Sequence, residues 1–162
     1  MPNIKKYILY TIIIIILFSI DRISKIYILN IAETSGQVDI YINSFLNFIL
    51  IWNTGIGFGL FSVDESFSYN ILTFLIIILN FIILYYAVKS NNITSYFFIM
   101  VLGGSLGNLF DRIYYSAVPD FIDINYNGYH WFIFNVADIF ISLGVIFMIL
   151  LEITDNNKTI NT

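Results

Sequence analysis

The sequence predicts an α-helical membrane protein with four transmembrane helices and a small β-sheet cradle formed by the first outer loop. Three observations predict this fold class. Hydrophobic residues make up 59% of the 162 residues and charged residues only 11%, whereas an ordinary soluble domain has about 25% charged residues. Four apolar stretches are each long enough to cross a bilayer, and most basic residues lie where the positive-inside rule expects them. No linker, repeat or charge block divides the chain, so we expect a single domain over residues 1–162.

The first expected span, residues 7–29, begins after Lys5 and Lys6, as the apolar region of a signal peptide would. No small-residue cleavage site follows it. The apolar pattern instead continues to Leu29, which gives about 23 residues, enough to cross ~30 Å of hydrocarbon as a helix. The other three spans are expected at residues 67–88, 93–110 and 131–151.

Basic residues in the short flanking segments predict the orientation. Lys5 and Lys6 precede the first span, and Lys89 lies in the short turn between the second and third spans. Lys158 follows the fourth span. Because cytoplasmic segments are rich in Lys and Arg, both termini and this turn are expected in the cytoplasm. The long segment 31–66 has four acidic residues and no basic residue, so it is expected outside. Three basic residues at the outer ends of their spans need another explanation: Arg22, Lys25 and Arg112.

The first outer loop shows the pattern of β-strands. Val38, Ile40 and Ile42 alternate with polar residues, which is typical of a half-buried strand. A second strand is expected over residues 48–52, followed by glycines that permit turns and close backbone approach. We therefore expect the cradle over about residues 36–62, on the outer face of the membrane.

Ionisable residues inside a membrane span cost a few kcal/mol, roughly, and are by default candidates for function. On the first span, Asp21 and Lys25 are four residues apart and share a helix face. A local ion pair that reaches toward the membrane surface would explain this pair equally well.

The third span ends in a run of glycines and polar residues. Gly104, Asn108 and Arg112 fall on one helix face, with Gly107 and Asp111 beside it. Close helix packing would explain the glycines. It does not explain three polar residues in succession at the helix end, unless they form a buried polar network.

The fourth span carries an isolated acid. Asn135, Asp138 and Ser142 lie along one helix face, and Asp138 sits in an apolar stretch with no basic residue within one turn. A buried carboxylate of this kind is protonated or is paired from another span. We expect its partners to be the acids and the arginine at the outer end of the third span.

The remaining chemistry is narrowed by exclusion. The chain has no cysteine, and its one histidine, His130, lies in an outer loop. Metalloprotease, nucleotide-binding and dinucleotide-binding motifs are absent from the sequence, and a net charge of -4 argues against nucleic acid as a partner. Two carboxylates are sufficient for one reaction. If they share a proton, one activates a water and the other polarises a carbonyl, which is the chemistry of an aspartic protease.

With these residues in view, the sequence resembles the lipoprotein signal peptidases, the bacterial type II signal peptidases. Each motif alone is short, but five of them occur in the right order on a scaffold of the right length. The segments that carry the resemblance are Asp21 to Lys25, Asn53 to Phe58, Gly103 to Arg112, Val118 to Phe121, and Phe134 to Asp138.

The resemblance implies roles for particular residues. Asp120 and Asp138 would be the catalytic pair. Asp111 is a competing acid that spacing alone does not exclude, and we interpret it as structural, orienting Arg112 or the helix end. It would belong to a supporting polar set with Asp21 and Lys25. The substrate-binding residues would be Asn53, Gly55, Asn108, Arg112 and Asn135.

The resemblance also implies an activity and a location. The substrate would be a diacylglyceryl-modified prolipoprotein, cut just before the lipid-bearing cysteine. The enzyme would lie in the bacterial cytoplasmic (inner) membrane among its lipids, with the site near the outer face. We expect a monomer that needs no metal or cofactor and is inhibited by the cyclic peptide globomycin. The sequence departs from the common family pattern at Arg22, Gly57 and Pro119, and the proline could change the hydrogen bonding beside Asp120.

Two other functions fit part of the sequence. A proton-coupled transporter or channel component would use the same acids as a relay, but it predicts polar residues through the whole bilayer depth. Here they gather at the outer side. A structural or assembly protein would explain the glycines and leaves the two separated acids without a role. The sequence therefore favours the peptidase.

Overall fold

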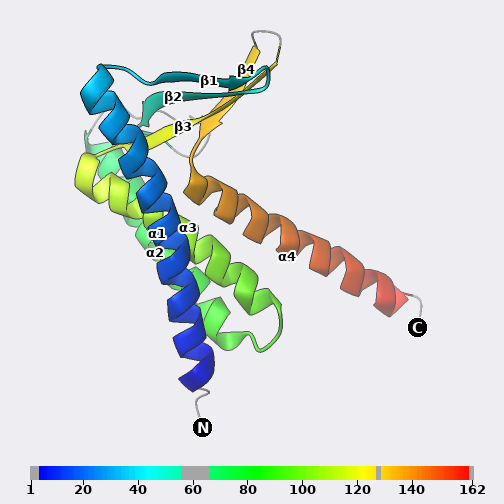
Figure 1. The fold of residues 1–162 in the computed structure, drawn as a ribbon. Helices are drawn as coiled ribbons and strands as arrows, with labels where there is room; N and C mark the ends of the chain where they lie inside the picture. The colour runs from blue at the N-terminus through cyan, green and yellow to red at the C-terminus, as the bar shows by residue number, and fades with distance from the viewer. Residues whose placement is uncertain (1–3, 56–65, 127–128, 161–162) are drawn as a thin grey trace.

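The computed structural model describes residues 4–55, 66–126 and 129–160, and it contains four helices and a four-stranded sheet (Figure 1). The chain forms one helix, two strands, two helices, two strands and a final helix. In chain order the elements are α1 (Ile4–Ser35), β1 (Asp39–Asn43), β2 (Leu46–Asn53), α2 (Ser66–Lys89), α3 (Thr94–Tyr115), β3 (Val118–Tyr126), β4 (Tyr129–Phe134) and α4 (Val136–Ile160).

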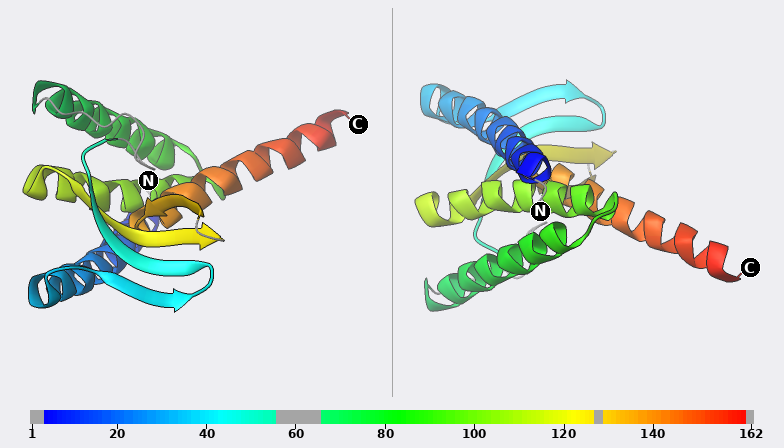
Figure 2. Two further views of the ribbon diagram at one scale, coloured as in Figure 1. Left: turned by 90° about the horizontal axis from the view of Figure 1, so that it is seen from above. Right: turned by 90° about the horizontal axis from the view of Figure 1, so that it is seen from below.

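Helix α3 is the central element of the helical part. It contacts each of the other three helices. Figure 2 shows α1 and α2 on either side of α3, whereas α4 contacts α3 and then diverges from the bundle. The sheet lies across one end of the helices (Figure 1). Any residue at the upper end of α3 is therefore close to α1, to the start of α4 and to the sheet.

The surface of the helices is apolar. Two segments of the described chain, Tyr69–Lys89 and Val136–Thr154, are long and apolar enough to cross a membrane. Large apolar side chains also point outward on all four helices, including Ile15, Phe81, Ile113 and Ile149, each more than half exposed. The buried positions, in contrast, include many charged and amide side chains. This distribution is the reverse of a soluble protein and suits a lipid environment.

The sheet is antiparallel throughout, in the order β1-β2-β3-β4. The two strands expected in the first outer loop are confirmed as β1 and β2. The expectation that this loop alone forms the sheet is wrong, because β3 and β4 come from the segment between α3 and α4. The part of the expected cradle at residues 56–62 lies outside the described residues.

The start of the fourth helix also differs from the prediction. Residues 131–134 were expected in the span and belong to β4 instead, and α4 begins at Val136. A short apolar and aromatic run is compatible with either a helix or a strand, and only the pairing with β3 decides between them.

Two glycines set the close approach of α3 to its neighbours. A Cβ atom at Gly104 would lie 2.5 Å from the backbone oxygen of Ala137 in α4. A Cβ atom at Gly107 would collide with the carboxylate of Asp21 in α1. The glycines therefore allow α4 and the polar face of α1 to lie directly against α3.

Candidate active site

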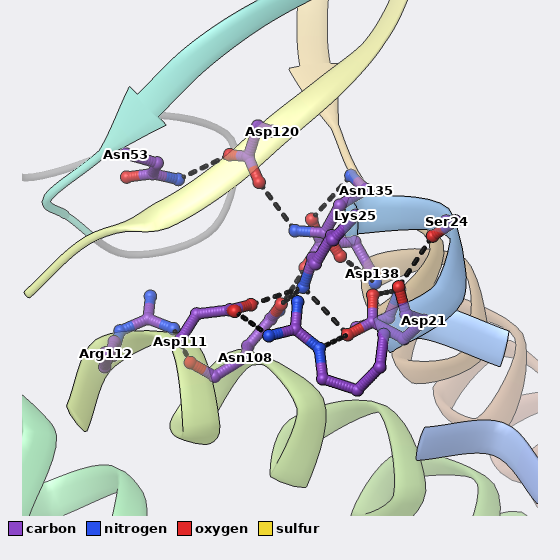
Figure 3. Close-up of polar contacts among 12 residues, drawn as sticks. Asp21, Ser24, Lys25, Asn53, Asn108, Asp111, Arg112, Asp120, Asn135 and Asp138 are labelled. Carbon is purple, nitrogen blue, oxygen red and sulfur yellow. Dashed lines mark hydrogen bonds and ion pairs between the residues drawn. The ribbon is translucent and has the colours of Figure 1, made fainter. Parts of the chain in front are cut away.

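The predicted polar residues meet in one buried cluster where the helices reach the sheet (Figure 3). They come from α1, α3, α4, the strands β2 and β3, and the residue that precedes α4. All of the polar ones are at most 9% exposed, and Gly55 is buried as well. The sequence-predicted residues brought together are Asp21, Lys25, Asn53, Gly55, Asn108, Asp111, Arg112, Asp120, Asn135 and Asp138.

Asp120 lies in β3 between two amides. Its Oδ1 atom accepts a hydrogen bond from Asn135 Nδ2 at 2.6 Å, and its Oδ2 atom accepts one from Asn53 Nδ2 at 2.8 Å. Burial raises the pKa of this carboxyl group to about 6, and the charge of Asp138 adds to the effect. The amide hydrogen bonds act in the opposite direction and do not offset the burial. Asp120 therefore changes its protonation near neutral pH.

Pro119 precedes Asp120 in the same strand and pairs with Trp52 of β2. The pairing of β3 with β4 begins only at Ile122. Pro119 thus stands where the strand has a neighbour on one side only, which is where a strand tolerates a residue that has no N–H group.

Asp138 lies in the first turn of α4, two residues after Val136, the first residue of the helix. The backbone N of Asn135 donates to Asp138 Oδ2, and the backbone N of Asp138 donates to Asn135 Oδ1, both at 3.2 Å. This reciprocal pair resembles a capping box, with Asp in place of the usual Glu or Gln. Because Asn135 also binds Asp120, one residue contacts both acids.

The second partner of Asp138 comes from α3. Asn108 Nδ2 donates to Asp138 Oδ1 at 2.8 Å. Asp138 is therefore paired from another helix, as expected. Its hydrogen-bonded partner on that helix is Asn108, and not one of the expected acids or the expected arginine. An amide takes this position, so the carboxylate is held by neutral donors (Figure 3).

Lys25 occupies the centre of the cluster and is fully buried. Its Nζ atom donates to Asp21 Oδ2 at 2.9 Å, to Asn108 Oδ1 at 2.8 Å and to Asp111 Oδ2 at 2.7 Å. An ammonium group has three donors and no acceptor. Asn108 must therefore turn its oxygen toward Lys25, and its nitrogen faces Asp138. The expected Asp21–Lys25 pair is present, and its burial excludes a simple surface ion pair.

Asp21 joins α1 to the beginning of α4. Its Oδ1 atom accepts a hydrogen bond from the backbone N of Ala137 at 3.0 Å, in the first turn of α4. The first backbone N–H groups of a helix have no partner within the helix, and a carboxylate there also interacts favourably with the helix dipole. Asp21 therefore fixes the position of the helix that carries Asp138.

Asp111 and Arg112 point to different partners, although they are neighbours in sequence. Asp111 binds Lys25 at 2.7 Å and Arg22 Nη1 at 2.5 Å. Arg112 Nη2 donates to the backbone oxygen of Gly55 at 2.8 Å. Asp111 therefore holds the cations of α1, which is a structural role as expected, whereas the guanidinium of Arg112 holds the segment after β2.

Sequence reasoning missed two contributors to this cluster. The sequence marks Arg22 as a basic residue out of place and as a departure from the family pattern but assigns it no role, although its place beside Asp21 and three residues before Lys25 indicates a second cation. Tyr69 of α2 donates its hydroxyl hydrogen to the backbone oxygen of Arg112 at 3.2 Å. No polar pattern around Tyr69 would have indicated this contact. The glycines and Phe58 expected to follow Gly55 in the first loop lie outside the described residues.

His130 lies in the β3–β4 hairpin and binds Asp123, with 2.8 Å between Nδ1 and Oδ2. Within the described part of the chain, no group of three or more His, Cys, Asp or Glu side chains could hold a metal ion.

An apolar cavity of about 310 Å³ lies beside Asp138. Aromatic residues of β4 and apolar residues of α4 form most of its wall, so the carboxylate of Asp138 borders a space suited to a hydrocarbon group. The lining residues are Phe132, Phe134, Asp138, Ile139, Ser142 and Leu143.

Comparisons with known proteins agree on one family. The profile of the family described as signal peptidase (SPase) II matches residues 13–154. The chain is 52% identical over 159 residues to the lipoprotein signal peptidase of Pelagibacter ubique, in an alignment that covers 98% of this chain and 96% of the relative. It is 34% identical over 155 residues to that of Anaplasma phagocytophilum, covering 95% of this chain and 97% of the relative.

Solved structures share this fold. Two structures described as bacterial membrane enzymes superpose with TM-scores of 0.76 and 0.71, at 27% and 28% sequence identity. The first match covers 92% of this chain and 90% of the other, and the second covers 90% and 93%. The family profile and the relatives agree, and the chain has the fold of a bacterial membrane enzyme: this chain belongs to the signal peptidase II family.

Proposed function

We propose that this protein is a membrane aspartic endopeptidase that removes the signal peptide from diacylglyceryl-modified prolipoproteins, cutting before the lipidated cysteine. One observation carries the proposal. Asp120 of β3 and Asp138 of α4 lie on two different elements, and Asn135 binds both of them. The names of the relatives supply the substrate class.

In this mechanism Asp120 and Asp138 share one proton. The ionised acid removes a proton from a water molecule, which attacks the scissile carbonyl carbon. The protonated acid donates a hydrogen bond to the carbonyl oxygen, which becomes the oxyanion, and the leaving amine then takes up a proton. Burial and the charge of Asp138 raise the pKa of Asp120 to about 6, so Asp120 can hold the shared proton near that pH.

The amides and Arg112 serve to orient the acids and the substrate. Asn53 and Asn135 fix the two oxygens of Asp120, and Asn108 fixes one oxygen of Asp138. Arg112 holds the backbone of Gly55, two residues after the end of β2. In the proposed complex, Asn53 and Gly55 contact the substrate from the sheet side, and Asn108, Arg112 and Asn135 contact it from the helices.

The membrane arrangement is part of the proposal. All four helices cross the membrane, both termini are cytoplasmic, and the sheet and the acid pair lie at the outer face of the bacterial inner membrane. Apolar side chains point outward on every helix, which supports this arrangement. The substrate enters sideways from the lipid, and the cavity beside Asp138 accepts an apolar part of it. The protein acts as a monomer and binds globomycin at the same site.

The rival function, a proton-coupled transporter or channel, has no support from the family. In the described residues, the buried acids gather at the sheet end of the helices, and the lower buried cluster is formed by Tyr10, Ala87, Ile99 and Leu102. That cluster offers no carboxylate relay toward the other membrane face.

The activity is tested with purified protein in detergent and two forms of one test precursor. One form carries the diacylglyceryl group on its cysteine, and the other carries the same sequence without the lipid. We expect cleavage of the lipidated form just before the cysteine, inhibition by globomycin, and no cleavage of the unlipidated form. Equal cleavage of both forms, or no cleavage of either, would contradict the proposed substrate class.

A further inference from the structure

Arg22 is a buried cation beside the proposed catalytic residues for which the proposed reaction has no use. It is 8% exposed, and its Nη1 atom lies 2.5 Å from Asp111 Oδ1. Its Nε atom lies 3.8 Å from Asp21 Oδ2. Its guanidinium carbon lies 4.9 Å from the centre of the Phe110 ring. Arg22 thus stands between two buried carboxylates and the ring of Phe110, which lies at the surface.

Arg22 completes a neutral group of charges. We call Asp21, Arg22, Lys25 and Asp111 the ion cluster, since ion pairs of 2.5 to 3.8 Å connect all four. It contains two cations and two anions, so its net charge is zero. Lys25 alone would leave one carboxylate without a counterion. A buried unpaired carboxylate is strongly unfavourable, and its field acts on other groups nearby because little water screens it.

The ion cluster is connected to the acid pair by two routes. Asp111 holds Lys25, Lys25 turns the oxygen of Asn108, and Asn108 donates to Asp138. Asp21 binds the backbone N of Ala137, the residue before Asp138. A change in the charge or position of Arg22 therefore reaches Asp138 through Asp111 and also through Asp21.

We propose that Arg22 is a positioning residue for the reaction: it holds Asp111 against Lys25, and its charge keeps the ion cluster neutral beside the acid pair. This inference rests on the proposed function, because that function gives Asp120 and Asp138 their catalytic role. Arg22 itself does not touch the substrate.

The sign of the expected effect follows from the charges around the acid pair. The charged groups that act on the acid pair are Lys25 and Asp21 from α1 and Arg112 from α3, besides the two acids themselves, Asp120 from β3 and Asp138 from α4. Tyr69 from α2 and Asp111 from α3 act on Arg112. Removing the charge of Arg22 leaves the ion cluster with one net negative charge. Negative charge nearby makes every carboxyl group harder to ionise, so the pH range of activity should move upward.

The test measures kcat and KM against pH on the lipidated precursor for the wild type and five variants. Arg22→Gln makes the ion cluster negative, and Asp111→Asn makes it positive. The double variant Arg22→Gln/Asp111→Asn is neutral again, and Arg22→Lys keeps the charge. Phe110→Leu is the control that removes the ring under Arg22 without changing any charge.

We expect opposite shifts. The bell-shaped profile of Arg22→Gln should move to higher pH by about half a unit to one unit, and that of Asp111→Asn to lower pH by a similar amount. The double variant, Arg22→Lys and Phe110→Leu should keep the wild-type position. Measured at the pH optimum of each enzyme, kcat of Arg22→Gln should fall about 3- to 10-fold, because Asp111 is no longer held against Lys25, with KM unchanged within about twofold.

A merely structural role for Arg22 would lower kcat or stability without shifts of opposite sign. The inference is overturned if Arg22→Gln and Asp111→Asn both keep the wild-type profile, or if both move in the same direction. If Arg22→Gln does not accumulate as folded protein, the pH profile of Asp111→Asn should still move to lower pH and that of the double variant should return to the wild-type position. A wild-type profile for Asp111→Asn then overturns the inference. Activity that survives in Asp120→Asn or Asp138→Asn would instead overturn the proposed function.

Discussion

A buried lysine organises the candidate site at the scale of single residues. Lys25 uses all three of its N–H groups on Asp21, Asn108 and Asp111, and none of its side chain is exposed. Since an amide can turn either end toward a neighbour, Lys25 decides which end of Asn108 faces Asp138. The buried charge of Lys25 thus fixes the orientation of the neutral amide that donates to Asp138.

Replacing Lys25 by Met should therefore destabilise the fold and stop the reaction. The change leaves Asp21 without its closest cation and Asp111 with Arg22 alone, so we expect a loss of about 3–5 kcal/mol in the free energy of unfolding. Thermal unfolding in detergent and processing of the lipidated precursor measure the two effects. The matched control is Lys5→Met, which changes an exposed lysine on the same helix. Equal stability of the two variants would contradict this role.

Asp120 should make activity depend on pH near neutrality. Its pKa of about 6 lies above the ordinary value of 3.8 because burial and Asp138 both disfavour the charged form. Asp120 therefore holds a proton below about pH 6 and loses it above that pH. A reaction that needs one protonated acid should lose kcat/KM as the pH rises through this range. The profile from about pH 4.5 to 8.5 measures this, and constant kcat/KM across the alkaline half would contradict the assignment.

At the scale of elements, the beginning of α4 is the point where the site is assembled. Asn135 precedes the helix, Asp138 lies in its first turn, and Asp21 of α1 binds the backbone N of Ala137 between them. The strand β3 brings Asp120 to the same place. Asn135 connects the two acids, since its side chain binds Asp120 of β3 and its backbone N binds Asp138 of α4.

The two functions of Asn135 can be separated by one substitution. In Asn135→Ser the hydroxyl group can still cap α4, but no amide reaches Asp120. We expect a change in the free energy of unfolding of less than about 1 kcal/mol and a fall in kcat of about 100-fold. In Asn135→Ala both contacts are lost, and stability should fall further. Wild-type kcat in Asn135→Ser would show that its amide does not orient Asp120.

The contact of α3 with α4 gives a second prediction at this scale. Gly104→Ala places a methyl group 2.5 Å from a backbone oxygen of α4, which cannot move away without shifting the helix. We expect it to destabilise by about 1–3 kcal/mol and to lower activity. Gly103→Ala is the matched control, because the nearest atoms to its methyl group belong to the side chain of Leu17 and not to a helix backbone, so we expect a smaller loss. Equal effects of the two substitutions on unfolding and processing would contradict this packing.

The elements show how far sequence reasoning reached. The helices and the strands β1 and β2 follow from apolar length and from the alternation of Val38, Ile40 and Ile42. Strand β4 was not predicted, because a run such as residues 131–134 has no period that separates a strand from a helix. The hydrogen-bond partners of Asp111 could not be predicted either, since they depend on how α1 lies against α3 and not on sequence spacing.

At the scale of the whole molecule, the sheet and the polar ends of the helices occur together at one end of an apolar bundle (Figure 1). In the proposed arrangement this end faces outward. Water then reaches the acids from the sheet side, and a lipid-anchored substrate reaches them from the membrane. The cations of the ion cluster lie at this end although the positive-inside rule would place basic residues at the other. They can do so because carboxylates pair them within the protein.

The orientation can be tested by labelling, since the chain has no cysteine that would give a background signal. Single cysteines are introduced by Tyr129→Cys in the sheet, where the side chain is 76% exposed, and by Asn91→Cys in the turn between α2 and α3. A membrane-impermeant thiol reagent applied to spheroplasts should label the first variant, and the second only after the membrane is opened. The reverse pattern would contradict the proposed topology.

The most direct test of the central claim is the rate of cleavage of the lipidated precursor by purified Asp120→Asn and Asp138→Asn. Each variant should retain the fold and lose kcat by about 1,000-fold or more, because neither can share a proton with the remaining acid. Asp123→Asn is the matched control, since Asp123 is a buried acid of the same strand that binds His130 and Asn125, outside the proposed site. It should cleave at close to the wild-type rate. Wild-type turnover in either member of the proposed pair, with the fold intact, would contradict the account.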